Sequence, residues 1–296
     1  MQKSNMTRRA LVNFPARPYL SLISVIAIAG YNLWLKDSTD IQLLIILIIL
    51  LVFIGLPHGA VDPALAKKAG LWSGVLGLIK FSIGYLSISL FILGVWFIVA
   101  ELAIIPMLAL SAWHFSADWL DYYPRPTCIA ISLAIICLPA LFYRTECLEI
   151  FYVLTPLSSQ MIVSGMALIS ISSTLYATLC LFSTREKNFQ VLAELAILLC
   201  AAFALPPIAY FTMYFCFLHS PLHLKKSLEQ LGISEVMLYA IPFTILSLGA
   251  GACLFLTLPK IEMSFQLIQV VFVGLFALTV PHMLLTGALK QKPRRK

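Results

Sequence analysis

Charged residues are scarce in this sequence, and long polar stretches are scarcer still. Only 11% of the 296 residues are Asp, Glu, Lys or Arg, against about a quarter in an average soluble domain. Hydrophobic residues make up 61%, and they fall into segments close to the roughly 20 residues that a helix needs to cross a bilayer. No room is left for a separate soluble domain. The composition therefore excludes an ordinary soluble enzyme and predicts a polytopic membrane protein.

Paired cysteine motifs are also missing. The seven cysteines lie mostly inside apolar segments, and no two have the C-x-x-C spacing, which argues against a disulfide framework or a zinc site. The net charge of +7 would suggest nucleic-acid binding in a soluble protein. In a membrane protein it indicates instead the side on which the basic loops lie. We therefore expect the lipid bilayer, and no nucleic acid, as the surroundings of the chain.

The apolar runs predict an all-α, polytopic transmembrane helical bundle of about ten spans, with eight or nine also compatible with the pattern. The expected spans are residues 18–35, 41–58, 75–99, 102–119, 127–143, 158–182, 190–206, 207–224, 236–258 and 265–289. Residues 1–17 form a basic leader and residues 290–296 a basic tail, so that 18–289 make up a single membrane-embedded domain. Helix breaks are expected at Thr155-Pro156 and Pro206-Pro207, because proline lacks the backbone N–H donor.

Basic residues indicate the orientation of these spans. Most of the 20 Lys and Arg residues lie in the leader, the tail and the connections that follow even-numbered spans. Because such residues concentrate on the cytoplasmic side, we expect a cell (inner) membrane protein with both termini in the cytoplasm. All five histidines lie late in even-numbered spans, which places them at similar depth in the cytoplasmic half of the bilayer.

The histidines occur in four short polar motifs within apolar runs. These are Gly55-Leu56-Pro57-His58-Gly59-Ala60-Val61-Asp62, Ser111-Ala112-Trp113-His114-Phe115-Ser116-Ala117-Asp118, Leu218-His219-Ser220-Pro221-Leu222-His223 and Val280-Pro281-His282. Ionisable residues at membrane depth mark functional sites by default, and neutral imidazole is a ligand for Fe, Cu and Zn. His219 and His223, four apart on a helix, can bind one ion from one face, and His58 and His114 could supply further ligands. The alternative is that each histidine only forms hydrogen bonds between helices.

Two aspartates and a fifth histidine accompany this candidate metal site. Asp62 and Asp118 each follow a histidine by four residues, so each carboxylate could accept the N–H of that imidazole and fix its tautomer. They could equally be interfacial residues at span ends, or direct ligands in a carboxylate-bridged two-metal site. His282 is either a fifth ligand candidate or a hydrogen-bond donor in a pocket.

Aromatic residues cluster beside the histidines. Trp113 and Phe115 flank His114, and Tyr214 precedes His219 by five residues. These rings could line a pocket for a long polyene or another flat apolar substrate. Aromatic belts and ordinary helix packing also produce such clusters, so both interpretations remain open at this stage.

Taken together, the four motifs resemble the Brp/Blh family, membrane β-carotene 15,15′-dioxygenases that accompany microbial rhodopsins. The resemblance rests on residues 55–62 and 113–118, the His219/His223 pair and Pro281-His282. It implies oxidative cleavage of the central double bond of all-trans-β-carotene with O₂ into two molecules of retinal. It also implies a non-haem Fe(II) centre held by His58, His114, His219 and His223, and a retinal-accepting rhodopsin as a partner.

Other functions fit less well. A membrane di-iron hydroxylase needs about eight histidines, and this chain has five. The remaining alternative is a non-catalytic membrane transporter, or a carotenoid- or haem-binding protein, that uses the histidines as proton relays or ligands. If the chain cleaves β-carotene, the substrate is about as long as the hydrocarbon core is thick, roughly 30 Å. A metal near the cytoplasmic face then predicts an oblique or bent tunnel, open to lipid, with the metal near its middle.

Overall fold

The computed structural model describes residues 23, 26–27, 29–35, 40–183 and 189–291, and within these ranges all regular structure is helical. The elements in chain order are η1 (Tyr31–Leu35), α3 (Asp40–Leu50), η2 (Leu51–Gly55), α4 (Pro57–Ala60), α5 (Asp62–Lys68), α6 (Gly74–Phe115), η3 (Ser116–Asp118), α7 (Arg125–Cys137), α8 (Pro139–Phe142), α9 (Arg144–Leu154), α10 (Ser159–Ser183), α11 (Phe189–Ala204), α12 (Pro207–Tyr214), η4 (Phe215–His219), α13 (Ser220–Leu231), α14 (Ile233–Thr257) and α15 (Met263–Gln291). The all-α prediction is confirmed. The basic leader, residues 18–22, 24–25 and 28 of the first expected span and residues 292–296 of the tail lie outside the described residues.

Six helical runs are long and apolar enough to cross a membrane. They are Ile41–Lys68, Gly74–Asp118, Arg125–Phe142, Ser159–Ser183, Ile233–Thr257 and Met263–Leu289. A membrane-spanning helical protein is thus confirmed, but the expected count of ten spans is not. Helix α11 is apolar but has only 16 residues, and the run from α12 through α13 carries two histidines and three charged residues that reduce its apolar character.

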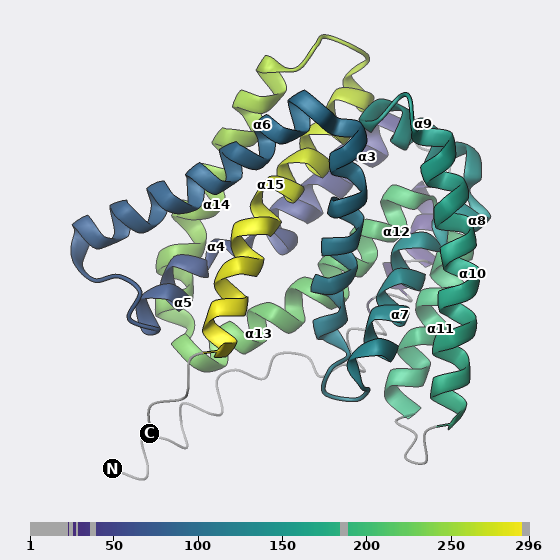
Figure 1. The fold of residues 1–296 in the computed structure, drawn as a ribbon, viewed down its shortest axis with the longest axis horizontal. Coiled ribbons are helices and arrows are strands. Elements are labelled where there is room, and N and C mark those ends of the chain that lie inside the picture. The colour runs from purple at the N-terminus through teal and green to yellow at the C-terminus, as the bar shows by residue number, and fades with distance from the viewer. Residues whose placement is uncertain (1–22, 24–25, 28, 36–39, 184–188, 292–296) are drawn as a thin grey trace.

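Two of the expected spans, 75–99 and 102–119, form the single helix α6. At about 1.5 Å per residue, 42 residues extend about 63 Å, roughly twice the thickness of the hydrocarbon core. The backbone leaves the helical region at Val99, where φ is −142° and ψ is 48°. At this bend the helix changes direction, and its two arms diverge (Figure 1). Residues 100–101, which separate the two expected spans, therefore belong to one bent helix and not to a loop.

Helices end just before Pro156 and Pro206-Pro207, where the sequence predicts breaks. Helix α9 ends at Leu154, and Thr155, just before Pro156, has a non-helical φ of −148°. Helix α11 ends at Ala204, and α12 begins at Pro207. A proline at the first position of a helix loses no intrahelical bond, since the N–H groups of the first turn have no helical partner.

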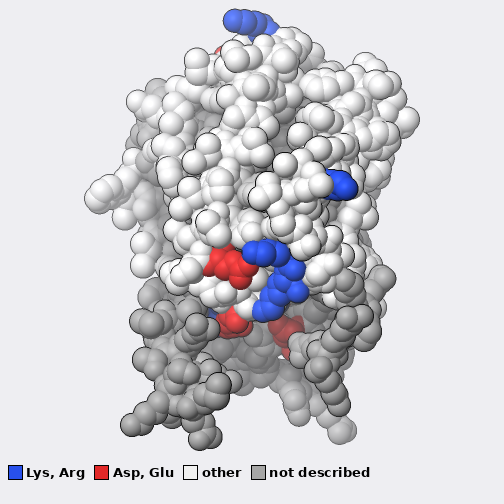
Figure 2. All heavy atoms as spheres, turned by 90° about the vertical axis from the view of Figure 1, so that its left-hand side faces the viewer, with Lys and Arg blue, Asp and Glu red and all other residues white. Residues whose placement is uncertain are grey.

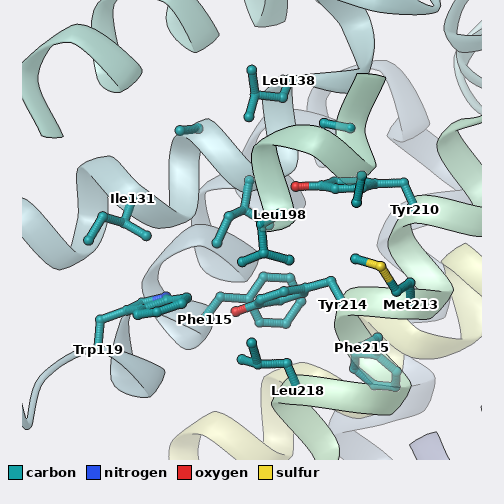
Figure 3. Close-up of a cluster of buried hydrophobic side chains, with 14 of the residues drawn as sticks. Phe115, Trp119, Ile131, Leu138, Leu198, Tyr210, Met213, Tyr214, Phe215 and Leu218 are labelled. Atoms are coloured by element: carbon teal, nitrogen blue, oxygen red, sulfur yellow. The ribbon is translucent and has the colours of Figure 1, made fainter. Parts of the chain in front are cut away.

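The helices form two groups with α15 between them. Helices α7 to α11 lie on one side of α15, and α4, α5, α14 and the first arm of α6 lie on the other (Figure 1). The larger group contains the main apolar core, in which Phe115 and Tyr214 meet with their ring centroids 5.0 Å apart (Figure 3). This core lies next to the histidines, because the ring centroids of Phe115 and Tyr214 are 4.7 Å and 6.3 Å from that of His219.

The surface of α6 and α14 is almost free of charge. Figure 2 shows this face, on which acidic and basic side chains gather mainly in one band near one end of the molecule. On α5, Lys67 pairs with Glu235 of α14 at 3.8 Å, and Lys68 donates a hydrogen bond to the carbonyl of Gln230. The uncharged area suits contact with lipid, and the band suits the boundary with water.

Candidate metal centre

The structure brings all five imidazoles into one cluster. His58 lies on α4, His114 near the end of α6, His219 at the end of η4, His223 on α13 and His282 on α15. Neighbouring ring centroids lie between 4.5 Å (His219–His223) and 6.4 Å (His223–His282) apart. Four helical segments far apart in the sequence therefore contribute to one cluster, whereas the expected metal site of four histidines came from three.

Local helix distortions position two of these histidines. A π-helical turn, η2, ends at Gly55 just before Pro57, and a second one, η4, ends at His219 just before Pro221. Such turns are frequent at functional sites. The amide of Gly59 donates to Leu56 instead of Gly55, which leaves the Gly55 carbonyl available to side chains. In a membrane, freed carbonyls must find such partners.

The Gly55 carbonyl fixes the tautomer of His58. His58 Nδ1 lies 2.5 Å from this oxygen, and the Ser220 hydroxyl lies 3.0 Å from the same nitrogen and 3.3 Å from the same carbonyl. Because a carbonyl can only accept, Nδ1 carries the proton and Nε2 has the lone pair. The sequence motif thus prepares His58 to bind a metal through Nε2.

A buried carboxylate has the same effect on His219. Asp118 Oδ2 lies 2.9 Å from His219 Nδ1 and accepts a hydrogen bond of 2.7 Å from the hydroxyl of Tyr214. His219 is completely buried, and Asp118 nearly so. The carboxylate holds the proton on Nδ1 and leaves Nε2 as a ligand atom, which is the usual arrangement beside a bound metal.

The free nitrogens converge. His219 Nε2 lies 3.0 Å from His114 Nε2, and each of His58, His114 and His219 offers a ring nitrogen within 4.8 Å of the other two. Two nitrogens about 2.1 Å from one ion and at about a right angle to each other are separated by about 3 Å. The spacing and the donor set therefore fit a single metal ion.

His223 occupies a different place in the cluster. Its ring lies beside that of His219, as the spacing of four residues predicts, but its Nε2 lies 3.2 Å from Asp118 Oδ1. Its side chain is 20% exposed, whereas that of His219 is fully buried. Asp118, His219 and His223 form a second group with metal-ligand spacing, which shares His219 with the first.

His282 is held by the other buried aspartate. Its Nδ1 lies 2.9 Å from both oxygens of Asp62, and the hydroxyl of Tyr85 donates to Asp62 Oδ2 at 2.9 Å. His282 is 5% exposed and Asp62 is 1% exposed. The ring centroid of His282 lies 5.1 Å from that of His114, so this imidazole belongs to the same cluster.

Both aspartates therefore have partners other than those that the sequence suggests. The spacing of four pairs Asp62 with His58 and Asp118 with His114, but Asp62 contacts His282 and Asp118 contacts His219 and His223. The spacing rule assumes one continuous helix. The chain instead leaves α4 at Val61 before α5 begins, and Asp118 lies in the 3₁₀ turn after α6.

Sequence reasoning missed Tyr85 and Ser220. Ser220 gives no signal beyond its position next to His219. Tyr85 does give one, because Ser82, Tyr85 and Ser89 recur at intervals of three and four residues in an apolar helix and so share one face. All three line the large cavity of the protein. A polar stripe on a membrane helix thus marked the inward face of α6.

One cavity of about 1010 Å³ adjoins the histidines. His58, His114 and His282 line it, together with mostly apolar side chains from both arms of α6 and from α9, α12, α14 and α15. These elements lie on both sides of α15 (Figure 1), so both helix groups contribute to the cavity lining. Ile83 and Ile245 line it and are about 60% exposed. The cavity therefore reaches the uncharged surface between α6 and α14.

The three aromatic candidates have different surroundings. Phe115 and Tyr214 line the cavity, and the ring centroid of Phe115 lies 4.7 Å from that of His219. Trp113 is half exposed and does not line the cavity; its ring lies 4.5 Å from the guanidinium of Arg125. Trp113 packs at the surface, while the other two rings form the wall next to the histidines.

We expect Gly55→Ala to destabilise the protein. A Cβ at Gly55 would lie 2.7 Å from Phe215 Cε1, and Phe215 is held between Phe211 and His219, with centroids 5.4 Å from each. Overpacking of this kind costs about 1–3 kcal/mol, measurable as a lower thermal midpoint in detergent. Gly59→Ala is the matched control, since a Cβ there meets no atom within 4 Å among the described residues. Equal midpoints for the two variants would contradict this packing.

The chain is similar to known proteins over most of its length. A family profile described as Beta-carotene 15,15′-dioxygenase matches residues 49–290, which include all five histidines. A protein named Beta-carotene 15,15′-dioxygenase from Uncultured marine bacterium 66A03 is 29% identical over 254 residues, covering 80% of this chain and 90% of that protein. No solved structure matches the chain.

Proposed function

The chain belongs to the β-carotene 15,15′-dioxygenase family, and from this premise we propose that it cleaves the central 15,15′ double bond of all-trans-β-carotene with O₂. The products are two molecules of retinal, each with one oxygen atom, so the reaction balances without an added reductant. We further propose a ferrous ion held by His58, His114, His219 and His223. The membrane location of the helices suits a substrate that dissolves in lipid.

One observation carries the proposal: the ring nitrogens of His58, His114 and His219 converge beside a long, mostly apolar cavity. Buried imidazoles of this kind need a partner for their lone pairs, and a divalent ion supplies it. A proton or ion pathway would need polar groups along its length. The cavity lining instead suits a hydrocarbon chain, which favours cleavage of a carotenoid over transport.

The residues of the chain prepare the site in three ways. Asp118 and the Gly55 carbonyl keep Nδ1 protonated on His219 and His58, so that Nε2 of each ring would be free to bind an ion. The apolar walls seat the polyene and exclude water. Phe115 and Tyr214 close the cavity beside the histidines. Bound ferrous iron supplies the redox chemistry that activates dioxygen.

The course of the cavity supports the expected oblique tunnel. Its lining extends from the lipid-facing residues Ile83 and Ile245 to Ile150 and Phe151 on α9. We propose that the histidines lie between these two parts of the lining, beside the central double bond of a symmetric C₄₀ polyene. We propose that the substrate enters from the membrane between α6 and α14.

For the topology we propose ten crossings of the inner membrane with both termini in the cytoplasm. Counting the second arm of α6, α11, the α12–α13 run and residues 18–35 adds four crossings to the six long helices. The charged band at one end of the molecule supports this orientation. A fluorescent protein that matures only in the cytoplasm, fused to the C-terminus, should be fluorescent; a dark fusion at normal expression would contradict the orientation.

A rhodopsin in the same membrane is the proposed acceptor of retinal.

Expression in cells that accumulate β-carotene tests the activity. Under aerobic, iron-replete conditions we expect the orange colour to fade and retinal to appear on chromatography of cell extracts. Iron chelation during growth should restore the colour, since the histidines would have no ion to hold. Unchanged carotene and no retinal in cells that contain the folded protein would favour a binding or transport function, and a strong visible haem band would favour haem binding.

A further inference from the structure

The structure contains a repeated unit of histidine, aspartate and tyrosine. In the first unit His219 Nδ1 contacts Asp118, which accepts from the hydroxyl of Tyr214. In the second unit His282 Nδ1 contacts Asp62, which accepts from the hydroxyl of Tyr85. Both aspartates are at least 96% buried. The same chain of contacts thus orients two imidazoles from different helices.

The second unit ends in a nitrogen that has no hydrogen-bond partner. His282 Nε2 is buried, and no described side chain or backbone group bonds to it. Whether this nitrogen carries a lone pair or a proton, leaving it buried without a partner costs free energy. The carboxylate on Nδ1 favours the lone pair on Nε2 and makes it more basic. These are the properties of a metal ligand.

The ring of His282 lies nearly as close to the rings of His58 and His114 as the ring of His219 does. Its ring centroid lies 5.6 Å from His58 and 5.1 Å from His114, close to the 5.2 Å and 4.7 Å that separate His219 from the same two rings. His282 also lines the cavity, as His58 and His114 do. His223 does not line it, and its Nε2 faces Asp118.

We propose that His282 is an additional ligand of the metal, bound through Nε2, with Asp62 and Tyr85 as the residues that position it. The inference rests on the proposed iron centre and extends it from four histidines to five. The ligands would then come from both ends of the chain, since His58 lies on α4 and His282 on α15. Closing the site requires α15 to pack between the two helix groups.

A thiolate at position 282 provides a direct test. We would purify His282→Cys in detergent, remove its metal and load it with cobalt(II). A thiol that binds cobalt releases its proton to the solvent, and charge transfer from the thiolate sulfur to the metal gives an intense near-ultraviolet band. We expect this band in His282→Cys. Ser247→Cys is the matched control, since Ser247 lines the same cavity from α14 but contacts none of the histidines, and it should show no band.

Metal content gives a second readout. We expect His282→Ala to bind ferrous iron more than about 100-fold more weakly than the wild type, and Asp62→Asn about 10- to 100-fold more weakly, as for the loss of a group that orients a ligand. Tyr85→Phe removes the hydrogen bonds of the hydroxyl to Asp62 and to the carbonyl of Leu278, and it should weaken iron binding by a smaller factor than Asp62→Asn does. Because wild-type Cys147 and Cys253 also line the cavity, the cobalt spectrum of the wild type is the baseline.

The outcomes separate this inference from the proposed function. Cobalt bound by His282→Cys without a thiolate band, or wild-type iron affinity in His282→Ala, would overturn the assignment of His282 and leave the iron centre in place. If His282→Ala does not fold, the cobalt spectrum of His282→Cys still decides. A folded wild-type chain that binds neither ion would instead contradict the iron centre itself.

Discussion

His219→Ala is expected to abolish both iron binding and retinal formation. Its imidazole is completely buried, its Nε2 lies 3.0 Å from His114 Nε2 and its Nδ1 is bonded to Asp118. The change removes a ligand and also takes an N–H donor from a buried carboxylate. Loss of an outer partner alone costs about 10–100-fold in metal affinity, so we expect a larger loss here. Iron per chain and retinal per cell are the two measurements.

Asp118→Asn is a milder change, with which the loss of iron affinity in His219→Ala can be compared. Asparagine keeps the size of the side chain and one acceptor oxygen, but it cannot serve both His219 and His223 as a carboxylate does. We expect iron affinity to fall about 10–100-fold while the helical circular dichroism spectrum is retained. If His219→Ala were folded and still held one iron per chain, the centre would have to lie elsewhere.

Ser89→Phe is expected to block retinal formation while iron remains bound. Ser89 is 4% exposed and lines the cavity on the first arm of α6, so a phenyl ring at this position can extend only into the space proposed for the polyene. Displacing a substrate by about 1 Å can reduce the rate about 100-fold. We expect a loss of retinal of at least this size at normal iron content.

Gly84→Phe is the matched control on the same helix. Gly84 is exposed, does not line the cavity, and a Cβ added there meets no atom within 4 Å among the described residues. The ring would face lipid, so retinal output should equal that of the wild type. Normal retinal output from Ser89→Phe would mean that the substrate does not occupy this part of the cavity.

The sequence was sufficient to identify the histidines but not the way in which they are held. Five imidazoles in an apolar chain are conspicuous, because each is costly at membrane depth, and they do meet in one cluster. The partners of Asp62 and Asp118 depend on where helices end. A break of one residue at Val61 turns Asp62 away from the His58 side, and periodicity alone does not locate such a break.

The helical crossings were likewise only partly predictable. Apolar runs mark the helices, but whether two runs form two helices or one bent helix depends on the backbone at a single residue, Val99. Tyr85 illustrates the same limit, because its partner Asp62 comes from another helix. Contacts between helices are set by packing, and a single sequence does not contain that information directly.

The lipid-facing side of the cavity also determines how the rate depends on substrate. Ile83 and Ile245 place its exposed residues within the membrane rather than in water. The fraction of cavities that hold substrate then depends on the mole fraction of carotene among the surrounding lipids. Adding empty bilayer at constant protein and constant carotene dilutes the substrate in two dimensions. The reaction would slow even though every concentration per litre stays the same.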